Sequence, residues 1–565
     1  MQPLVLADSR TLKKAMNPQS AGTQPAAQPH TQLHPSAPGA AVAWQDTRAG
    51  RGVAAPALWL GAITLLGLAL RVWALGAKGL WLDEAFSIWM SRHALPDLFD
   101  WLVRIDQHPP LYYVLLHGWL AFGDSEAWVR GLSALTGTLT IPIFFAFVRT
   151  LSADHPALIA AFVLAISPFH VRFAQEARMY ALLTLAAATT FLCVAIILTP
   201  APAAPFGRRR AGWIGYPLAA VATLLTHNTA VFLPIAVNLF MVPFILVRRR
   251  QAPPAGAAVP GDLRRARPLF APLHAPPLTA WLVAQLAMVL LWLPWSVAFV
   301  RQSIGVYAQF WIQPPTVQTV LDTLTTFASA FFPGNLLWPA AVWLFFGALL
   351  VLGLVALRHS PALLALLLVL WLTPFAGEWL VSLRRPIFYD RTLIWASLPL
   401  FTLAAFGVAY LRRPWLPAVA LVALLGIQSL SLHNYYTYFQ KEDWRGAAAY
   451  LAERYDPGDL LLFNATWVQI PFDYYFRNFY PDADRHGAPI DLFDGGALEP
   501  KMTPADLPRL DDLIRDRDRV WLIYSHDWYT DPQKLIPAAL NRQLTLLDQQ
   551  VFYGLELRLY GEAPK

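Results

Sequence analysis

The chain has 565 residues, of which 56% are hydrophobic and 14% are charged, and its mean hydropathy is +0.42. A soluble protein carries about 25% charged residues. This chain has too few charged residues to cover the surface of a protein in water, so the composition excludes an ordinary soluble enzyme. The net charge of +7 does not indicate nucleic-acid binding, because the basic residues lie at the ends of apolar stretches. The single cysteine, Cys193, lies within an apolar stretch, which excludes a disulfide framework and a cysteine-based zinc site.

The N-terminal segment 1–52 is predicted to be a disordered cytoplasmic tail. It is rich in Pro, Ala and Gln and has no apolar periodicity, so it cannot bury enough surface to offset the entropy lost on ordering. We do not interpret it as a signal peptide, because no apolar stretch closely follows Lys13 and Lys14.

Residues 53–433 are predicted to form a membrane domain of about 11–13 transmembrane helices. The long apolar region 211–247 is divided at His227-Asn228, because a polar pair is costly in lipid. Segment 109–122 is apolar but too short to span. Eleven stretches are predicted spans: 52–70, 131–149, 156–172, 180–199, 213–227, 229–247, 278–299, 337–357, 360–380, 393–411 and 414–432.

Arginines in the short loops set the expected orientation. With eleven spans and the N-terminus inside, the clusters Arg208–Arg210 and Arg248–Arg250 and the pair Arg412-Arg413 fall on the cytoplasmic side, as the positive-inside rule requires. The outer face then carries the loop 71–130, the connection 170–179, the loop 381–392 and the C-terminal part. An odd number of spans requires that segment 109–122 lies in the membrane interface or re-enters the membrane without crossing it.

Residues 434–565 are predicted to form a soluble, extracytoplasmic α/β domain. The charge density rises there, and strand-like runs at 459–468, 519–525 and 544–560 alternate with helical stretches at 444–454 and 504–517.

Asp83 and Glu84 follow the first span among aromatic residues. Adjacent side chains diverge on a helix or strand, so one carboxylate is expected to face a site and the other to hold the loop or a second ligand. Apolar surroundings raise the pKa of a carboxyl group, which suits a general base. The alternative is an interfacial helix start with acidic residues in its first turn.

Two further outer segments carry polar side chains. His108 precedes Pro109-Pro110, which suits the start of a helix; it is either a site residue or an ordinary loop residue. If a helix starts near His170, Glu176 and Tyr180 share one face. Arg178 lies at the membrane edge, where a charge needs a partner.

Arg384, Arg385 and Arg391 occupy a short outer loop, against the positive-inside trend. A guanidinium group suits a phosphate, so these residues are candidates for binding a lipid phosphate. The alternative is pairing with Asp390 and contact with ordinary phospholipid. No dense acidic cluster requires a metal, so no cofactor is expected, although a divalent metal stays possible.

Three segments resemble motifs of C-type membrane glycosyltransferases: Leu82-Asp-Glu84, His108-Pro-Pro-Leu-Tyr-Tyr113 and Glu176-Ala-Arg-Met-Tyr180. The nearest families are the protein O-mannosyltransferases of glycosyltransferase family 39 and the bacterial aminoarabinose-transferase-like enzymes. The resemblance covers about residues 55–435, and the segment Lys441–Gly446 is also similar to bacterial members.

The resemblance implies a transferase that uses a polyprenyl-phosphate-linked sugar at the outer membrane face. It makes Asp83 the catalytic carboxylate, aligns Glu84 with the next acidic position, matches His108 to the family histidine, and places Arg178 and Tyr180 at the donor site. The segment Arg385–Arg391 departs from the family pattern.

The predicted function is an inverting sugar transfer to a hydroxyl acceptor, with Asp83 as base, arginines at the departing phosphate, and membrane lipid but no nucleic acid as a partner. Neither sugar nor acceptor can be named. One alternative is a transporter or flippase, which predicts charged residues in mid-span and a repeat of two halves. The other is a receptor whose spans serve only as an anchor.

Overall fold

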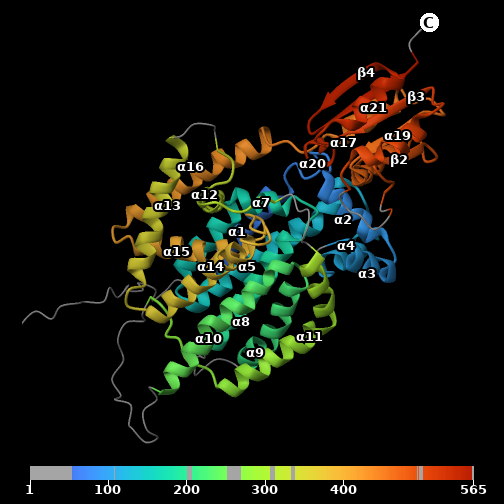
Figure 1. Cartoon of the computed structure of the whole chain (residues 1–565). Helices are drawn as coiled ribbons and strands as arrows, with labels where there is room; N and C mark the ends of the chain where they lie inside the picture. Colours follow the sequence, from blue (N-terminus) through green and yellow to red (C-terminus); the bar gives the residue numbers. More distant parts are fainter. Residues whose placement is uncertain are drawn as a thin grey trace, which may run out of the picture.

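The computed structural model describes residues 54–106, 108–199, 206–250, 269–305, 312–332, 337–492, 494 and 500–562. The predicted tail 1–52 lies outside the described residues. Figure 1 shows a bundle of long helices with a small sheet domain at one end, next to the blue helices α2–α4. The fold class predicted from the sequence, a helical polytopic membrane protein with a C-terminal α/β domain, is confirmed.

All eleven predicted spans fall on helices within the described ranges. Eight of these helices are long and apolar enough to cross a membrane, and nine are if a bent pair counts as one span. The eight are α1 (Ala54–Val72), α5 (Glu126–Leu151), α8 (Tyr180–Leu198), α10 (Phe232–Arg250, preceded by the 3-10 turn η1, Asn228–Val231), α11 (Leu278–Gly305), α13 (Leu337–Ala356), α14 (Pro361–Ser382) and α16 (Trp415–Thr437).

Two predicted spans fall short of that test. Helix α9 (Phe206–Leu224) carries three arginines, Arg208–Arg210, in its first turns. Helix α15 (Ser397–Tyr410) has 14 residues, although the 3-10 turn η2 (Ile394–Ala396) extends it at its start. At 1.5 Å per residue α15 spans only about 21 Å. It is almost entirely buried among the other helices.

The predicted span 156–172 is not straight. It forms α6 (Asp154–Ile166) and α7 (Pro168–Ala174), which meet at 58°. Pro168 disfavours a helical conformation at the preceding Ser167, and the buried Arg71 of α1 donates to the carbonyls of Leu164 and Ala165 at 3.2 and 3.0 Å. Carbonyl groups at the helix end are thereby satisfied inside the bundle.

The connection after α7 corrects another expectation. Residues 175–179 form turns and bends, and α8 begins only at Tyr180. Glu176 and Tyr180 therefore do not share the face of one helix. The division at His227-Asn228 is confirmed: α9 ends at Leu224, and the side chain of Asn228 donates to Gln302 Oε1 at 2.9 Å.

The loop after α1 folds into three short helices, α2 (Leu82–Arg92), α3 (Leu95–Arg104) and α4 (Leu111–Leu120). Helix α4 has 10 residues, about 15 Å in length, which is too short to cross a bilayer. A further short helix, α12 (Val317–Ala328), precedes α13.

The C-terminal domain has a five-stranded sheet in the order β2-β1-β3-β5-β4. Strands β2, β1 and β3 are parallel; β5 pairs antiparallel with β3, and β4 pairs antiparallel with β5. The run 544–560, predicted as one strand-like segment, is a hairpin that turns at Gly554 with φ +85°; β2 and helices α18 and α21 were not predicted. The strands are β1 (Leu460–Asn464), β2 (Asp484–Ala488), β3 (Arg519–Tyr524), β4 (Thr545–Phe552) and β5 (Leu555–Gly561).

Helices cover both faces of this sheet and form two apolar cores. They are α17 (Trp444–Ala452), α18 (Gln469–Phe476), α19 (Leu507–Ile514), α20 (Asp527–Thr530) and α21 (Leu535–Gln543), with 3-10 turns at Thr466–Val468 and Pro504–Asp506. The domain rests on the loop helices through α18, where Tyr475 Oη accepts from the backbone N–H of Leu80 at 2.7 Å.

Candidate active site

Asp83 lies in the first turn of α2 and brings together segments distant in sequence. Its Oδ2 is 3.2 Å from Nη1 of Arg391 and 3.9 Å from Nε of Arg178. About a quarter of the Asp83 side chain is exposed, against 4% for Arg178. The carboxylate is therefore open on one side and held by two cations on the other.

These arginines decide the protonation state of Asp83. Burial alone raises the pKa of Asp83, but the charges of Arg178 and Arg391 outweigh burial and hold it below its usual value. The expectation of a raised pKa is wrong for this reason. Asp83 is ionised at neutral pH and can accept a proton.

Arg178 connects Asp83 to His108. It donates to the backbone carbonyl of Asp83 and to Ser87 Oγ, both at 3.3 Å, and its Nη2 lies 3.5 Å from His108 Nε2. His108 Nδ1 lies 2.8 Å from Asp106 Oδ1. Because the guanidinium group can only donate, we assign the acceptor role to Nε2 and the proton to Nδ1, facing Asp106.

Arg391 lies among aromatic rings. Its guanidinium carbon is 4.8, 5.6 and 5.9 Å from the ring centres of Tyr389, Tyr180 and Trp81 respectively. Stacked rings fix the plane of a guanidinium group while its edge can still donate. This places Tyr180 beside Arg391, the arginine that contacts Asp83.

The loop that carries Arg391 is attached to the end of α14. Thr392 Oγ1 donates to the buried Glu378 at 2.7 Å, and Ser382 Oγ accepts from the backbone N–H groups of Ile387 and Phe388 at 3.0 and 2.9 Å. Glu378 was missed because it lies inside an apparently ordinary apolar span. An acid in a span, 14 residues before a threonine in an outer loop, was the available signal.

The three loop arginines have different surroundings. Arg385 donates to the backbone carbonyl of Ser303, and Arg384 is exposed. Of the three, Arg391 is the one placed against Asp83. A joint phosphate site formed by Arg384, Arg385 and Arg391 stays a prediction, because Arg385 contacts Ser303 whereas Arg391 contacts Asp83.

Glu84 is fully buried, with a side-chain exposure of 0%. Its two oxygens accept from Arg130 Nε and Nη2, both at 2.7 Å, from Lys441 Nζ at 2.9 Å and from the backbone N–H of Ala177 at 2.9 Å. Against the effect of burial, these partners lower the pKa of Glu84 to about 2. A catalytic role for Glu84 does not fit this geometry; it fastens the loop to α5 and to the 175–179 connection.

Glu176 is also buried, but it faces Arg172, whose Nε lies 3.2 Å from Glu176 Oε1. Arg172 in turn packs against the rings of Phe173 and Phe439 at 5.0 and 4.9 Å. Among the described contacts of Glu176, none reaches Asp83. The structure thus pairs Glu176 with Arg172, and a position of Glu176 in the donor site stays a prediction.

His227, used in the sequence only to divide two spans, lies next to the site. Its ring centre is 5.4 Å from that of His108 and 6.0 Å from that of Tyr180. His227 Nδ1 accepts from the backbone N–H of Thr229 at 3.2 Å. Burial, with the nearby charges of Arg178 and Arg391, keeps the pKa of His227 well below its usual value, so the ring is neutral.

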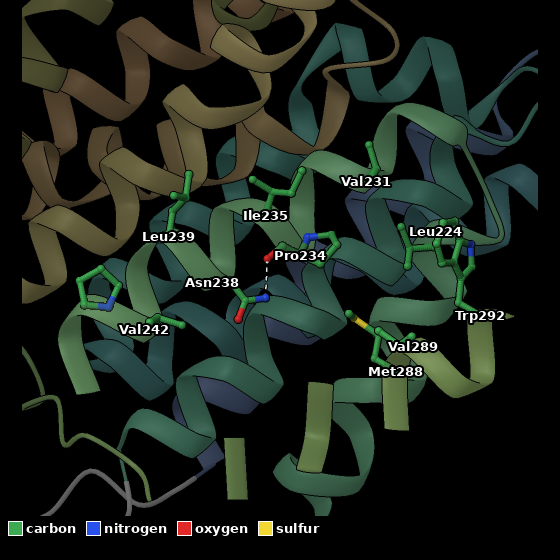
Figure 2. Close-up of a pocket in the computed structure, with 11 residues that line it drawn as sticks. Leu224, Val231, Pro234, Ile235, Asn238, Leu239, Val242, Met288, Val289 and Trp292 are labelled. Atoms are coloured by element: carbon green, nitrogen blue, oxygen red, sulfur yellow. Dashed lines mark hydrogen bonds between the residues drawn. The ribbon is translucent and has the colours of Figure 1, made fainter. Parts of the chain in front are cut away.

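An apolar groove of about 560 Å³ lies along α10 and α11 (Figure 2), and its lining includes Leu224 and Val231, which stand three residues before and four residues after His227 in the sequence. Asn238, its one polar lining residue, donates to the carbonyl of Pro234 and to Gln285 Oε1, both at 2.9 Å. The groove therefore suits a hydrocarbon chain. Its other lining residues are Pro234, Ile235, Leu239, Val242, Pro243, Met288, Val289 and Trp292.

In the part of the chain that the structure describes, no group of three or more His, Cys, Asp or Glu side chains is placed to hold a metal ion.

Comparisons with known proteins agree with this architecture. Residues 107–254 match the family described as dolichyl-phosphate-mannose-protein mannosyltransferase. This match includes His108, Glu176, Arg178, Tyr180 and His227. No curated protein matches the chain in sequence.

Solved structures match over nearly the whole chain. ArnT from Cupriavidus metallidurans in the apo state has a TM-score of 0.59 and 15% identity, covering 90% of this chain and 99% of its own. The same enzyme bound to undecaprenyl phosphate has a TM-score of 0.58 and 14% identity, with the same coverage. The archaeal oligosaccharyltransferase AglB from Archaeoglobus fulgidus, in complex with an inhibitory peptide and a dolichol-phosphate, has a TM-score of 0.53 and 12% identity, covering 90% of this chain and 74% of its own.

Together these findings describe a multi-pass membrane protein with a C-terminal sheet domain that shares the fold of ArnT and AglB, and its residues 107–254 match a mannosyltransferase family.

Proposed function

We propose that this enzyme transfers a sugar from a polyprenyl phosphate carrier to a hydroxyl group of an acceptor at the outer face of the membrane, with Asp83 as the general base. The observation that carries the proposal is the pairing of an ionised, partly exposed Asp83 with Arg391 at 3.2 Å. A base and a cation for the leaving phosphate are the two groups that such a transfer requires.

The reaction follows from the placement of these two groups. Asp83 takes the proton of the acceptor hydroxyl as its oxygen forms a bond to the anomeric carbon of the sugar. The bond from that carbon to the phosphate oxygen breaks, and the electron pair leaves with the polyprenyl phosphate. Attack opposite the leaving group inverts the anomeric configuration. Arg391 stabilises the negative charge that the phosphate gains.

Arg178 and His108 support both roles. Arg178 keeps Asp83 ionised and holds its backbone carbonyl, while Asp106 orients His108 through Nδ1. The His108 Nε2 lone pair is directed toward Arg178 and keeps the guanidinium group in place. We assign His108 and Arg178 to positioning and Tyr180 to the wall of the donor site.

The lipid part of the donor fits the apolar groove shown in Figure 2. The lining of the groove runs from Val231, at the end of η1, to Pro243 in α10, a length of about 18 Å. ArnT and AglB have been solved with undecaprenyl phosphate and a dolichol-phosphate respectively, which supports a carrier of this class.

Incubation of the purified enzyme in nanodiscs with radiolabelled polyprenyl-phosphate sugars and a membrane extract as acceptor tests the proposal. Label is expected to leave one carrier for an acceptor, and NMR of the product should show the inverted anomer. A protein that moves the intact labelled carrier between leaflets without breaking the sugar–phosphate bond would instead be a transporter, and retention of configuration would exclude direct displacement.

A further inference from the structure

The linker between α16 and the C-terminal domain touches the loop that carries Asp83. Lys441 and Glu442 lie just before α17, and their side chains are 3% and 15% exposed respectively. Both turn toward α2 rather than toward water. This placement needs a reason, because long charged side chains normally keep their charge in solvent.

Glu442 caps the helix that presents Asp83. Helix α2 starts after Trp81, whose side chain makes no capping hydrogen bond. The carboxylate of Glu442 takes that place: its Oε2 accepts from the backbone N–H of Leu82 at 3.2 Å. A negative charge at a helix N-terminus also interacts favourably with the helix dipole.

Two side chains of the C-terminal domain contact Glu442. Trp444 Nε1 donates to its Oε2 at 2.6 Å, and His526 Nε2 lies 3.3 Å from its Oε1. His526 follows β3 and packs against the ring of Trp467 at 4.8 Å. The core of the domain and the first turn of α2 are thus connected through one carboxylate.

Lys441 adds a second connection one residue away. Its Nζ donates to Glu84 at 2.9 Å, and Glu84 immediately follows Asp83. Lys441 therefore binds Glu84, and Glu442 binds the backbone of Leu82. These are the two residues on either side of Asp83.

We propose that the C-terminal domain sets the position of Asp83, with Glu442 and Lys441 as positioning residues. The inference rests on the proposed role of Asp83 as base. When the cap is lost, the first turn of α2 frays and Asp83 leaves its position between the acceptor and Arg391. A displacement of about 1 Å in an active site lowers the rate by about 100-fold.

The test compares Glu442→Ala with Arg445→Ala in the full-length protein. Arg445 lies in the first turn of α17, directly after the linker, and contacts Glu126 and the carbonyl of Gly76 instead of α2. Glu442→Ala is expected to lower kcat by about 10- to 100-fold with little change in the KM for the donor, while Arg445→Ala keeps wild-type kcat. Glu442→Gln, which retains an oxygen acceptor for Leu82, is expected to recover most of the activity.

Amide hydrogen exchange gives a second readout that does not depend on turnover. Exchange in the peptide covering α2 is expected to increase in Glu442→Ala and not in Arg445→Ala. Unchanged exchange in α2, or equal losses of kcat in both variants, would overturn the inference. If the wild-type protein transfers no sugar but Glu442→Ala still exchanges faster in α2, the cap is supported and the proposed function is contradicted.

Discussion

Asp83 and Glu84 are neighbours in sequence with opposite environments. Asp83 keeps part of its carboxylate open beside Arg391, whereas Glu84 has every oxygen engaged and no exposure. Their side chains diverge because consecutive residues point about 100° apart on a helix. Two adjacent acids thereby separate into one that stays partly open beside Arg391 and one that is fully engaged in structural contacts.

Arg391→Gln tests the charge balance at Asp83. Because Arg178 and Arg391 depress the pKa of Asp83, the carboxylate form persists at neutral pH, and activity is lost as the pH falls through that depressed pKa. Removing Arg391 raises the pKa of Asp83, so the acid limb of the kcat/KM profile should move to higher pH. The rate should also fall by about 100-fold through loss of the phosphate partner. An acid limb at the wild-type pH would contradict the assignment.

Glu84→Gln is predicted to act on stability. The pKa of Glu84 lies near 2, below its usual 4.5, so the stabilisation is fully present above about pH 4.5 and is lost as the pH falls toward 2. Breaking a buried ion pair costs about 3 kcal/mol. Thermal unfolding at neutral pH should show a lower midpoint for this variant, and the difference should narrow in acid. The exposed Glu453→Gln, whose partner is Arg454, serves as the control.

The sequence pointed to residues that lie close together in the structure where a motif or an unexpected charge gave a signal. Arg178 and Arg391 were singled out, and the structure places both against Asp83. Arg384 and Arg385 carried the same signal but have other surroundings, because neighbouring side chains of one loop can point to different sides. His227 and Glu378 carried no motif, so their proximity to the site followed only from the packing of helices.

At the scale of elements, α13 and α15 approach each other through glycines. A Cβ built at Gly353 would lie 2.1 Å from the carbonyl oxygen of Leu403, and one at Gly407 would lie 1.9 Å from that of Leu349. Small residues allow helix backbones to pack this closely in membranes. The short, buried α15 depends on this contact.

Gly353→Ala should therefore destabilise the bundle by about 2 kcal/mol through overpacking. Gly347 lies in the same helix, and a Cβ there would meet nothing within 4 Å. Gly347→Ala is the matched control and should leave the unfolding midpoint unchanged. Equal midpoints for the two variants would show that the close approach of α13 and α15 is not a constraint.

Helices and strands could be predicted where the sequence was apolar, or alternated regularly, over a long stretch. Helices occupy every predicted span in the described ranges because about 20 apolar residues have few other conformations in lipid. The bend between α6 and α7 was not predicted: Pro168 was a visible signal, but the hydrogen bonds from Arg71 that satisfy the carbonyls at the bend come from another helix. Strand β2 has the sequence Asp-Arg-His-Gly-Ala, which shows no alternation, and only its pairing with β1 makes it a strand.

At the scale of the whole molecule, the site, the loop helices α2–α4 and the C-terminal domain occupy one end of the bundle (Figure 1). The arginine clusters of the sequence predict that this end faces outward. The topology is therefore part of the function, because it decides on which side the donor and the acceptor meet.

Labelling of intact cells tests this orientation. In a Cys193→Ala background, the exposed Asp482→Cys in the C-terminal domain should react with a membrane-impermeant maleimide. His359→Cys, exposed between α13 and α14, should react only after permeabilisation. The reversed pattern would place the site on the cytoplasmic side and exclude the proposed outer-face transfer.

The central claim is that Asp83 is the base of a sugar transfer, and Asp83→Asn tests it most directly. Asparagine keeps the shape of the side chain but cannot take the proton. Transfer from the labelled polyprenyl carrier should fall by about 1,000-fold or more, while donor binding and the unfolding midpoint stay near wild type. The exposed Asp97→Asn on the same outer loop should retain full activity. Transfer by Asp83→Asn at the wild-type rate would contradict the account.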